Sequence, residues 1–319
     1  MTKRERVIAA INKQETDGVP SGFFIHFPHD CIKGEAAVKA HVKYFEDTDM
    51  DMVKIMNENL VPDMPEIKTA EDYSKMPGVD GDAAFINDQI ALTKEILKSY
   101  QEDGFTVGTL HGIVASAIHP MQNTMGYEGS REKLCEFLRK NPEKALEGME
   151  KIADAMCVLA RKYIKVGLDG VYYAALGGEK QYFTDEEFKE WIRPFDLKIM
   201  KAIKEAGGYC ILHICHKNLN MNRYEGYEEY CDAVNWGVYD APYSLEEGKE
   251  LFHGKTIMGG MENRSGVLVD GSEADVCRVV RELIETFGRT GFILGADCTL
   301  ATEQDLRKVR AAVETARSL

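Results

Sequence analysis

Residues 141–175 read NPEKALEGMEKIADAMCVLARKYIKVGLDGVYYAA, and this stretch contains both alternating elements of the fold. Asn141 before Pro142 is typical of a helix start, because an Asn side chain can cap free backbone N–H groups and proline suits the first helical position. An apolar periodicity of about 3.6 residues follows. Gly167–Ala175 is then a short apolar run, which indicates a buried β-strand. The stretch therefore predicts a helix that leads into a strand.

Seven more short apolar runs occur along the chain, and the segments between them carry helix signals. The predicted strands are Ser21–Phe27, Met50–Met56, Phe105–Gly112, Gly167–Ala175, Tyr209–Cys215, Ala233–Val238, Thr256–Met261 and Phe292–Asp297. Further predicted helix N-caps are Thr2 with Glu5, Thr184 with Glu187, Ser244 with Glu247, Ser272 with Asp275, and Thr302. Eight strands alternating with helices in about 300 residues match a single α/β domain over residues 1–319, a (β/α)8 barrel, better than a doubly wound sheet.

Two segments fit this alternation poorly and are predicted to be elaborated loops after the second and third strands. They are Asn57–Asn87, which contains three prolines, and Ala115–Ser130. Because the loops that follow barrel strands open onto the C-terminal face, we expect both segments to roof the mouth of the barrel. Met121, Met125 and Tyr127 either line such a lid or simply pack against the core.

The charge of the chain excludes two classes of partner. Acidic residues outnumber basic ones 53 to 39, which gives a formal net charge of -14. Such a protein repels phosphate backbones and anionic lipids, so we expect no nucleic acid and no membrane surface among its partners. The 8 cysteines form no CxxC pair, and the charged N-terminus does not resemble an export signal. We therefore expect reduced thiols and a cytoplasmic protein.

Catalytic groups of a (β/α)8 barrel come from the C-terminal ends of its strands. In strand order these residues are His26 and His29, Asn57 and Glu58, His111, Tyr172 and Tyr173, His213 and Cys215, Tyr239 and Asp240, Glu262 and Asn263, and Asp297 and Cys298. We interpret His26, Asn57, His111 and Tyr172 as substrate-binding residues. The alternative is that they only hold loops in place through hydrogen bonds.

The sequence Leu212-His213-Ile214-Cys215 is the sharpest chemical feature. Side chains two apart on a strand point to the same face, with about 6.5–7 Å between their Cα atoms, so one metal ion can bridge them. Cys298 can add a second thiolate from the last strand. Three protein donors and an open position are the arrangement of catalytic zinc, and thiolates favour zinc over magnesium or calcium.

The sequence does not decide the roles of several residues near this predicted metal site. His216 is an alternative ligand to His213, or it only lines the loop. Glu262, Asp240 and Asp297 are candidates for a fourth ligand or for a hydrogen-bond acceptor of the metal-binding imidazole, and each can instead cap a loop.

The chain resembles the uroporphyrinogen decarboxylase superfamily, which uses a (β/α)8 barrel. The resemblance runs almost end to end. Its motifs are TKRERVIAAINKQETDGVP (2–20), LRKNPEKALEGMEKIADAMCVLARKYIKVGLDGVYY (138–173), LHIC (212–215), NWGVYDAPYSLEEGKEL (235–251), IMGGMENRSGVLVDGS (257–272) and GFILGADCTLATEQDLRKVRAAVETAR (291–317).

Two chemistries within this superfamily can be separated on physical grounds. True decarboxylases resemble one another in an Arg-rich segment after the first strand, which holds the carboxylates of the tetrapyrrole. This chain reads PSGFFIHFPHD over residues 20–30 and has no Arg between Val7 and Gly129. The zinc methyltransferase branch, similar to methylcobamide:coenzyme M methyltransferases, carries an HxC pair and a distant Cys. Those positions are His213, Cys215 and Cys298 here.

The resemblance implies zinc-dependent transfer of a methyl group between a corrinoid, carried on a partner protein, and a thiol or methylated small substrate. Some zinc members use an additional acidic ligand near the pair. Here the preceding same-face residue is Ile211, so an acid from another strand would have to replace it. The sequence leaves open the direction of transfer and whether the chain forms a homodimer.

Two other functions remain as alternatives. One is a decarboxylase that needs no cofactor, for which the missing arginines are unfavourable. The other is a binding module without catalytic activity that captures a corrinoid or a methylated osmolyte. Activity that resists chelators would favour the first, and corrinoid binding without methyl exchange would favour the second.

Overall fold

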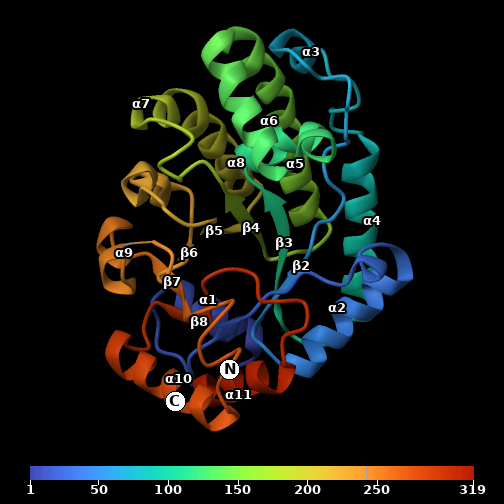
Figure 1. Cartoon of the computed structure of the whole chain (residues 1–319). Helices are drawn as coiled ribbons and strands as arrows, with labels where there is room; N and C mark the ends of the chain where they lie inside the picture. Colours follow the sequence, from blue (N-terminus) through green and yellow to red (C-terminus); the bar gives the residue numbers. More distant parts are fainter. Residues whose placement is uncertain (242) are drawn as a thin grey trace.

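The computed structural model describes residues 1–241 and 243–319 and contains eight parallel strands around a common axis (Figure 1). The strands are β1 Ser21–Gly22, β2 Met52–Ile55, β3 Phe105–His111, β4 Gly170–Ala175, β5 Tyr209–Ile214, β6 Ala233–Trp236, β7 Thr256–Met261 and β8 Phe292–Ala296. Each strand from β2 to β7 pairs with the next one in sequence, and β8 pairs with β1. This nearly closed barrel confirms the predicted fold class.

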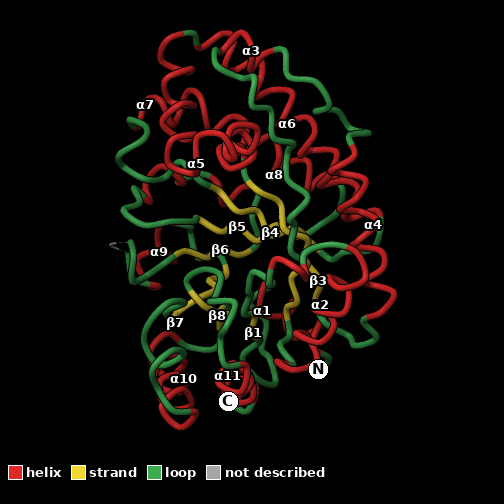
Figure 2. Tube along the Cα trace, turned by 45° about the vertical axis from the view of Figure 1, so that its right-hand side comes forward, coloured by secondary structure: helices red, strands yellow, loops and turns green. Residues whose placement is uncertain are grey.

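Helices surround the strands on the outside, as Figure 2 shows in red around yellow. They are α1 Lys3–Ile11, α2 Gly34–Thr48, α3 Ala70–Ser74, α4 Ala84–Ser99, α5 Ile113–Lys140, α6 Pro142–Lys165, α7 Asp185–Glu187, α8 Arg193–Glu205, α9 Leu245–Leu251, α10 Glu273–Phe287 and α11 Leu306–Arg317. Short 3-10 turns span His29–Cys31, Met221–Tyr224 and Tyr227–Glu229, and a π-helical segment, Phe188–Ile192, leads into α8.

Most helix starts follow the capping residues that the sequence indicates. Capping boxes begin at Thr2, Thr184, Ser244 and Ser272, and the Asn141 side chain caps α6. The prediction at Thr302 is wrong, because α11 begins only after Asp305, whose side chain accepts a bond from the Arg307 N–H. The Thr302 hydroxyl instead donates to the backbone carbonyl of His26 at 2.9 Å.

The two segments predicted as loops are partly helical. Residues 115–130 lie within α5, so that prediction is wrong. The start of α5 is buried nearly all round, and a helix without a polar face shows no clear 3.6-residue period. Gly126 breaks the helix with a positive φ of 73°. Residues 57–87 contain α3 and the first turn of α4, and the remainder is irregular.

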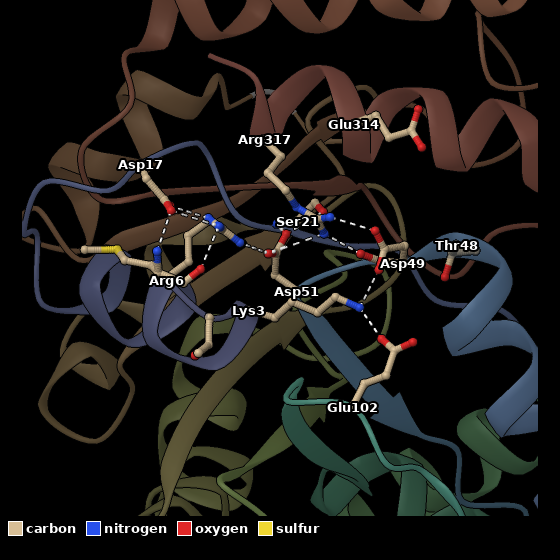
Figure 3. A network of polar contacts seen from close by, with 12 residues as sticks. Lys3, Arg6, Asp17, Ser21, Thr48, Asp49, Asp51, Glu102, Glu314 and Arg317 are labelled. Atoms are coloured by element: carbon tan, nitrogen blue, oxygen red, sulfur yellow. Dashed lines mark hydrogen bonds and ion pairs between the residues drawn. The ribbon is translucent and has the colours of Figure 1, made fainter.

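The junction between β1 and β2 is closed by side chains, because these strands share no ladder. Asp51, which is fully buried, accepts bonds from the Ser21 N–H at 3.0 Å and from Arg6 Nη1 at 2.5 Å. The Asp51 N–H donates to the Ser21 carbonyl at 3.0 Å. Figure 3 shows this network, in which Arg317 also approaches Asp51. Hydrogen bonds between Ser21 and Asp51 thus join the two strands where a ladder is missing, and the buried ion pair with Arg6 holds Asp51 in place.

Helix α1 packs against β2, β3 and β8 at the ends where these strands begin. The Thr256 hydroxyl at the start of β7 donates to the Ala10 carbonyl at 3.0 Å, and Arg4 Nε contacts Asp169 just before β4 at 2.6 Å. The N-terminal end of the barrel is therefore covered, and the C-terminal end remains for a site. Among the described residues, no helix has the length and apolar character that crossing a bilayer requires.

We expect Asp51→Ala to lower the free energy of unfolding by about 3–5 kcal/mol, because it leaves the buried Arg6 guanidinium without one of its partners. Chemical denaturation monitored by circular dichroism measures this change. Asp82→Ala is the matched control, since the Asp82 side chain is 99% exposed, and we expect it to change stability by less than about 0.5 kcal/mol. Equal effects of the two substitutions would show that the junction does not depend on this ion pair.

Candidate metal centre

Three of the predicted site residues converge at the C-terminal ends of β5 and β8. His213 belongs to β5, Cys215 follows it directly, and Cys298 follows β8. Cys298 Sγ lies 3.4 Å from His213 Nε2 and 3.9 Å from Cys215 Sγ, and the three donor atoms all lie within 4.8 Å of one another. In the described part of the chain no carboxylate joins this compact group.

These separations can be compared with those that a tetrahedral zinc ion imposes. Zn–S bonds of about 2.3 Å and Zn–N bonds of about 2.0–2.1 Å place two sulfurs about 3.8 Å apart and a sulfur about 3.6 Å from a nitrogen. The observed 3.9 Å and 3.4 Å are close to both values. The donor set therefore fits zinc in spacing and in chemistry, with one ligand fewer than a four-coordinate ion takes.

Asn235 orients the imidazole of this group. Its Nδ2 donates to the carbonyls of Met258 and Ala296 at 3.0 Å and 3.1 Å, so its Oδ1 must act as an acceptor. That oxygen lies 2.6 Å from His213 Nδ1. His213 therefore carries its proton on Nδ1, and the lone pair of Nε2 points to the thiols. Sequence analysis missed Asn235 and named carboxylates as candidates for this acceptor.

Tyr172 packs against the same imidazole and does not project into the mouth of the barrel. Its hydroxyl donates to Asn235 Oδ1 at 2.8 Å, and its ring stacks on His213 with 5.3 Å between ring centroids and an interplanar angle of 24°. Only 3% of Tyr172 is exposed. The structure thus places this predicted substrate-binding residue behind the donor group.

The pKa values of the two thiols are shifted in opposite directions. A hydrogen bond from Cys215 holds the pKa of the Cys298 thiol well below its usual range. The same hydrogen bond, together with burial, raises the pKa of Cys215. The pair therefore holds one thiolate readily, and a cation between the sulfurs would be needed to stabilise both.

The remaining predicted substrate-binding residues lie around β1 to β3. Asn57 is buried, and its Oδ1 accepts from the Asn59 N–H at 3.0 Å, as a loop-holding residue would. His26 is exposed and pairs with Glu58 at 2.9 Å. His111 packs edge to face against His119, and burial lowers the pKa of His111 to about 4. None of the three belongs to the donor group.

A cavity of about 390 Å³ opens beside the two sulfurs. It is lined by Ile214, Cys215, His216, Lys217, Gly237, Asp240, Asn263, Arg264, Asp297 and Cys298. Burial raises the pKa of Asp297 to about 7, and this carboxylate accepts from the Tyr239 N–H at 3.1 Å. The cavity thus carries both basic and acidic groups next to the candidate metal centre.

His216 takes a different direction from its neighbour Cys215. Its φ of 83° lies in the left-handed region, and its ring runs nearly parallel to that of Tyr127. Its Nδ1 lies 3.7 Å from the buried carboxylate of Glu179. Of the two histidines considered for the metal, His213 and not His216 belongs to the compact group.

Eight parallel strands with a compact His-Cys-Cys group at their C-terminal ends define a (β/α)8 barrel protein with a candidate metal centre at its mouth. The family model of uroporphyrinogen decarboxylase (URO-D) matches residues 46–319, and the chain belongs to this family. No match was found among curated proteins.

Two solved structures share the fold. A methyltransferase from Methanosarcina mazei superposes with a TM-score of 0.79 at 16% identity, over 99% of this chain and 98% of that chain. A B12-independent methionine synthase from a Shewanella species, in complex with selenomethionine, gives a TM-score of 0.56 at 12% identity, over 94% of each chain. At these identities the likeness concerns the fold.

We expect Asn235→Leu to weaken zinc binding by about 10- to 100-fold, because the imidazole loses the acceptor that sets its tautomer and direction. Competition with a chromophoric chelator measures the affinity. Asn59→Leu is the matched control, since Asn59 is also buried but bonds to Gln89. An Asn235→Leu protein that binds zinc as tightly as the native chain would rule out this role.

Proposed function

We propose that this protein is a zinc-dependent methyltransferase that moves a methyl group between a corrinoid, carried on a partner protein, and a thiol or methylated small substrate. The observation that carries the proposal is the His213, Cys215 and Cys298 group, in which the distances from Cys298 to His213 and to Cys215 are close to those around a tetrahedral zinc ion. Three protein ligands leave one position for a substrate, which is the arrangement of catalytic zinc sites.

Zinc, when bound, supplies a Lewis acid that lowers the pKa of a thiol and keeps its sulfur nucleophilic near neutral pH. The side chains of the protein bind the ion and orient its ligands. His213 and the two cysteines hold the ion, and Asn235 and Tyr172 keep the imidazole in one tautomer and one orientation. A neutral imidazole and two thiolates cancel the charge of the ion.

The cavity supports a small substrate. At about 390 Å³ it lies at the lower end of the range for small-molecule pockets. A corrinoid is a large macrocycle, so we expect it to approach from outside the barrel while bound to its carrier. The mouth at the C-terminal strand ends is the face on which such an encounter would take place.

The family and the fold favour this proposal over the alternatives. The URO-D family contains decarboxylases, but this chain has no Arg between Val7 and Gly129 to hold a polycarboxylate. The Methanosarcina mazei protein that shares the fold is a methyltransferase.

Metal analysis of the native chain, purified without chelators, tests the proposal. We expect about one zinc per chain, and Cys298→Ala should lose most of it because only two donors remain. Methyl transfer between free methylcobalamin and a small thiol should fall by at least about 100-fold in that variant. Cys277→Ala, in helix α10 away from the donor group, is the matched control. A metal-free native protein with full activity would contradict the proposal.

A further inference from the structure

Lys54 is a charged side chain inside the barrel. It occupies the middle of β2 between Val53 and Ile55, in a strand that is otherwise apolar, and it is only 5% exposed. Its Nζ lies 4.6 Å from the ring centroid of Phe24 and 4.4 Å from that of Tyr172. Interiors of such barrels are usually filled by branched apolar residues, so a lysine at this position calls for a physical explanation.

No carboxylate in the described part of the chain neutralises this ammonium group. Neither a hydrogen bond nor an ion pair reaches Lys54 Nζ, and the nearby Glu58 pairs with His26 instead. The two aromatic rings offer only weak cation–π stabilisation. A buried charge without a partner is costly, so retention of Lys54 points to an anion that is supplied in another way.

The two cysteines of the donor group act electrostatically on Lys54. Burial lowers the pKa of Lys54 to about 8, and Cys298, Cys215 and Glu58, in that order, oppose this shift. In the metal-free chain Lys54 is therefore mostly protonated at neutral pH. The ring of Tyr172 contacts both Lys54 and His213, so one side chain of β4 links the cation on β2 to a candidate metal ligand on β5.

The charge of the centre changes when a substrate enters. Zinc with one neutral imidazole and two thiolates has no net charge. A thiol bound at the open position would give its proton to solvent, and its sulfur would add one negative charge in a site of low dielectric constant. An ammonium group that touches the same tyrosine ring as His213 would partly compensate that charge, whereas it would do nothing for a neutral ligand.

We propose that Lys54 supplies the positive charge that balances an anionic ligand at the metal centre, and so makes the centre select thiolates over neutral donors. This inference rests on the proposed function, because it presumes the zinc site. It gives Lys54 a part in substrate binding through its electric field, without contact to the metal.

The test compares an anionic with a neutral ligand on the full zinc-loaded chain. Calorimetric titrations with 2-mercaptoethanol and with imidazole give the ratio of the two affinities at neutral pH. We expect Lys54→Met to lower the ratio of thiol to imidazole affinity by at least about 10-fold. The attraction between a buried ammonium and a nearby thiolate corresponds to at least that factor in affinity. Lys54→Arg keeps the charge and should leave the ratio within about threefold of the native value.

Lys39→Met is the matched control, because the Lys39 side chain is 74% exposed on α2, outside the barrel interior. It should leave the ratio unchanged. A general loss of structure would weaken both ligands together and would not move the ratio, so an unchanged ratio in Lys54→Met at about one zinc per chain overturns this inference alone. A native chain that takes up no zinc overturns this inference and the proposed function together.

Discussion

The geometry of the site depends on the hydrogen bonds that the side-chain amide of Asn235 makes. Its nitrogen donates to backbone carbonyls of β7 and β8, and its oxygen accepts from His213 on β5 and Tyr172 on β4. A single side chain of β6 therefore connects five neighbouring strands. Because all four of its bonds are made, its orientation is unique, and with it the tautomer and the direction of the imidazole.

Stability and chemistry are separated along the barrel axis. At the N-terminal end, Asp51 and Arg6 close the junction between β1 and β2, and α1 covers the strand starts. At the C-terminal end, the donor atoms come from β5 and β8, which are separated by two strands in the sheet order. The curvature of a nearly closed barrel is what brings these two strand ends within reach of one ion, so closure of the junction at one end sustains the geometry at the other.

The sequence predicts part of this site well, for a physical reason. Alternation along a strand places His213 and Cys215 on one face, and the end of the last strand identifies Cys298, so local periodicity is enough. The sequence does not predict roles for Asn235 and Lys54, because each is a single polar residue in a short apolar strand. Only the folded barrel shows which side chains they face. A polar residue in the middle of such a strand is nevertheless a usable signal. The start of α5 was missed because burial on all sides removes the periodicity that reveals a helix.

The charges inside the barrel also explain how one lysine can be tolerated in two states of the proposed enzyme. Without metal, the low pKa of Cys298 supplies a thiolate close to the buried ammonium of Lys54. With zinc bound, the ion would neutralise the two thiolates, and Lys54 would lose that compensation. An anionic ligand would then restore a negative charge near Lys54. Under the proposed function, metal binding itself would therefore raise the affinity of the barrel for a thiolate substrate, beyond the bond that the substrate forms with the ion.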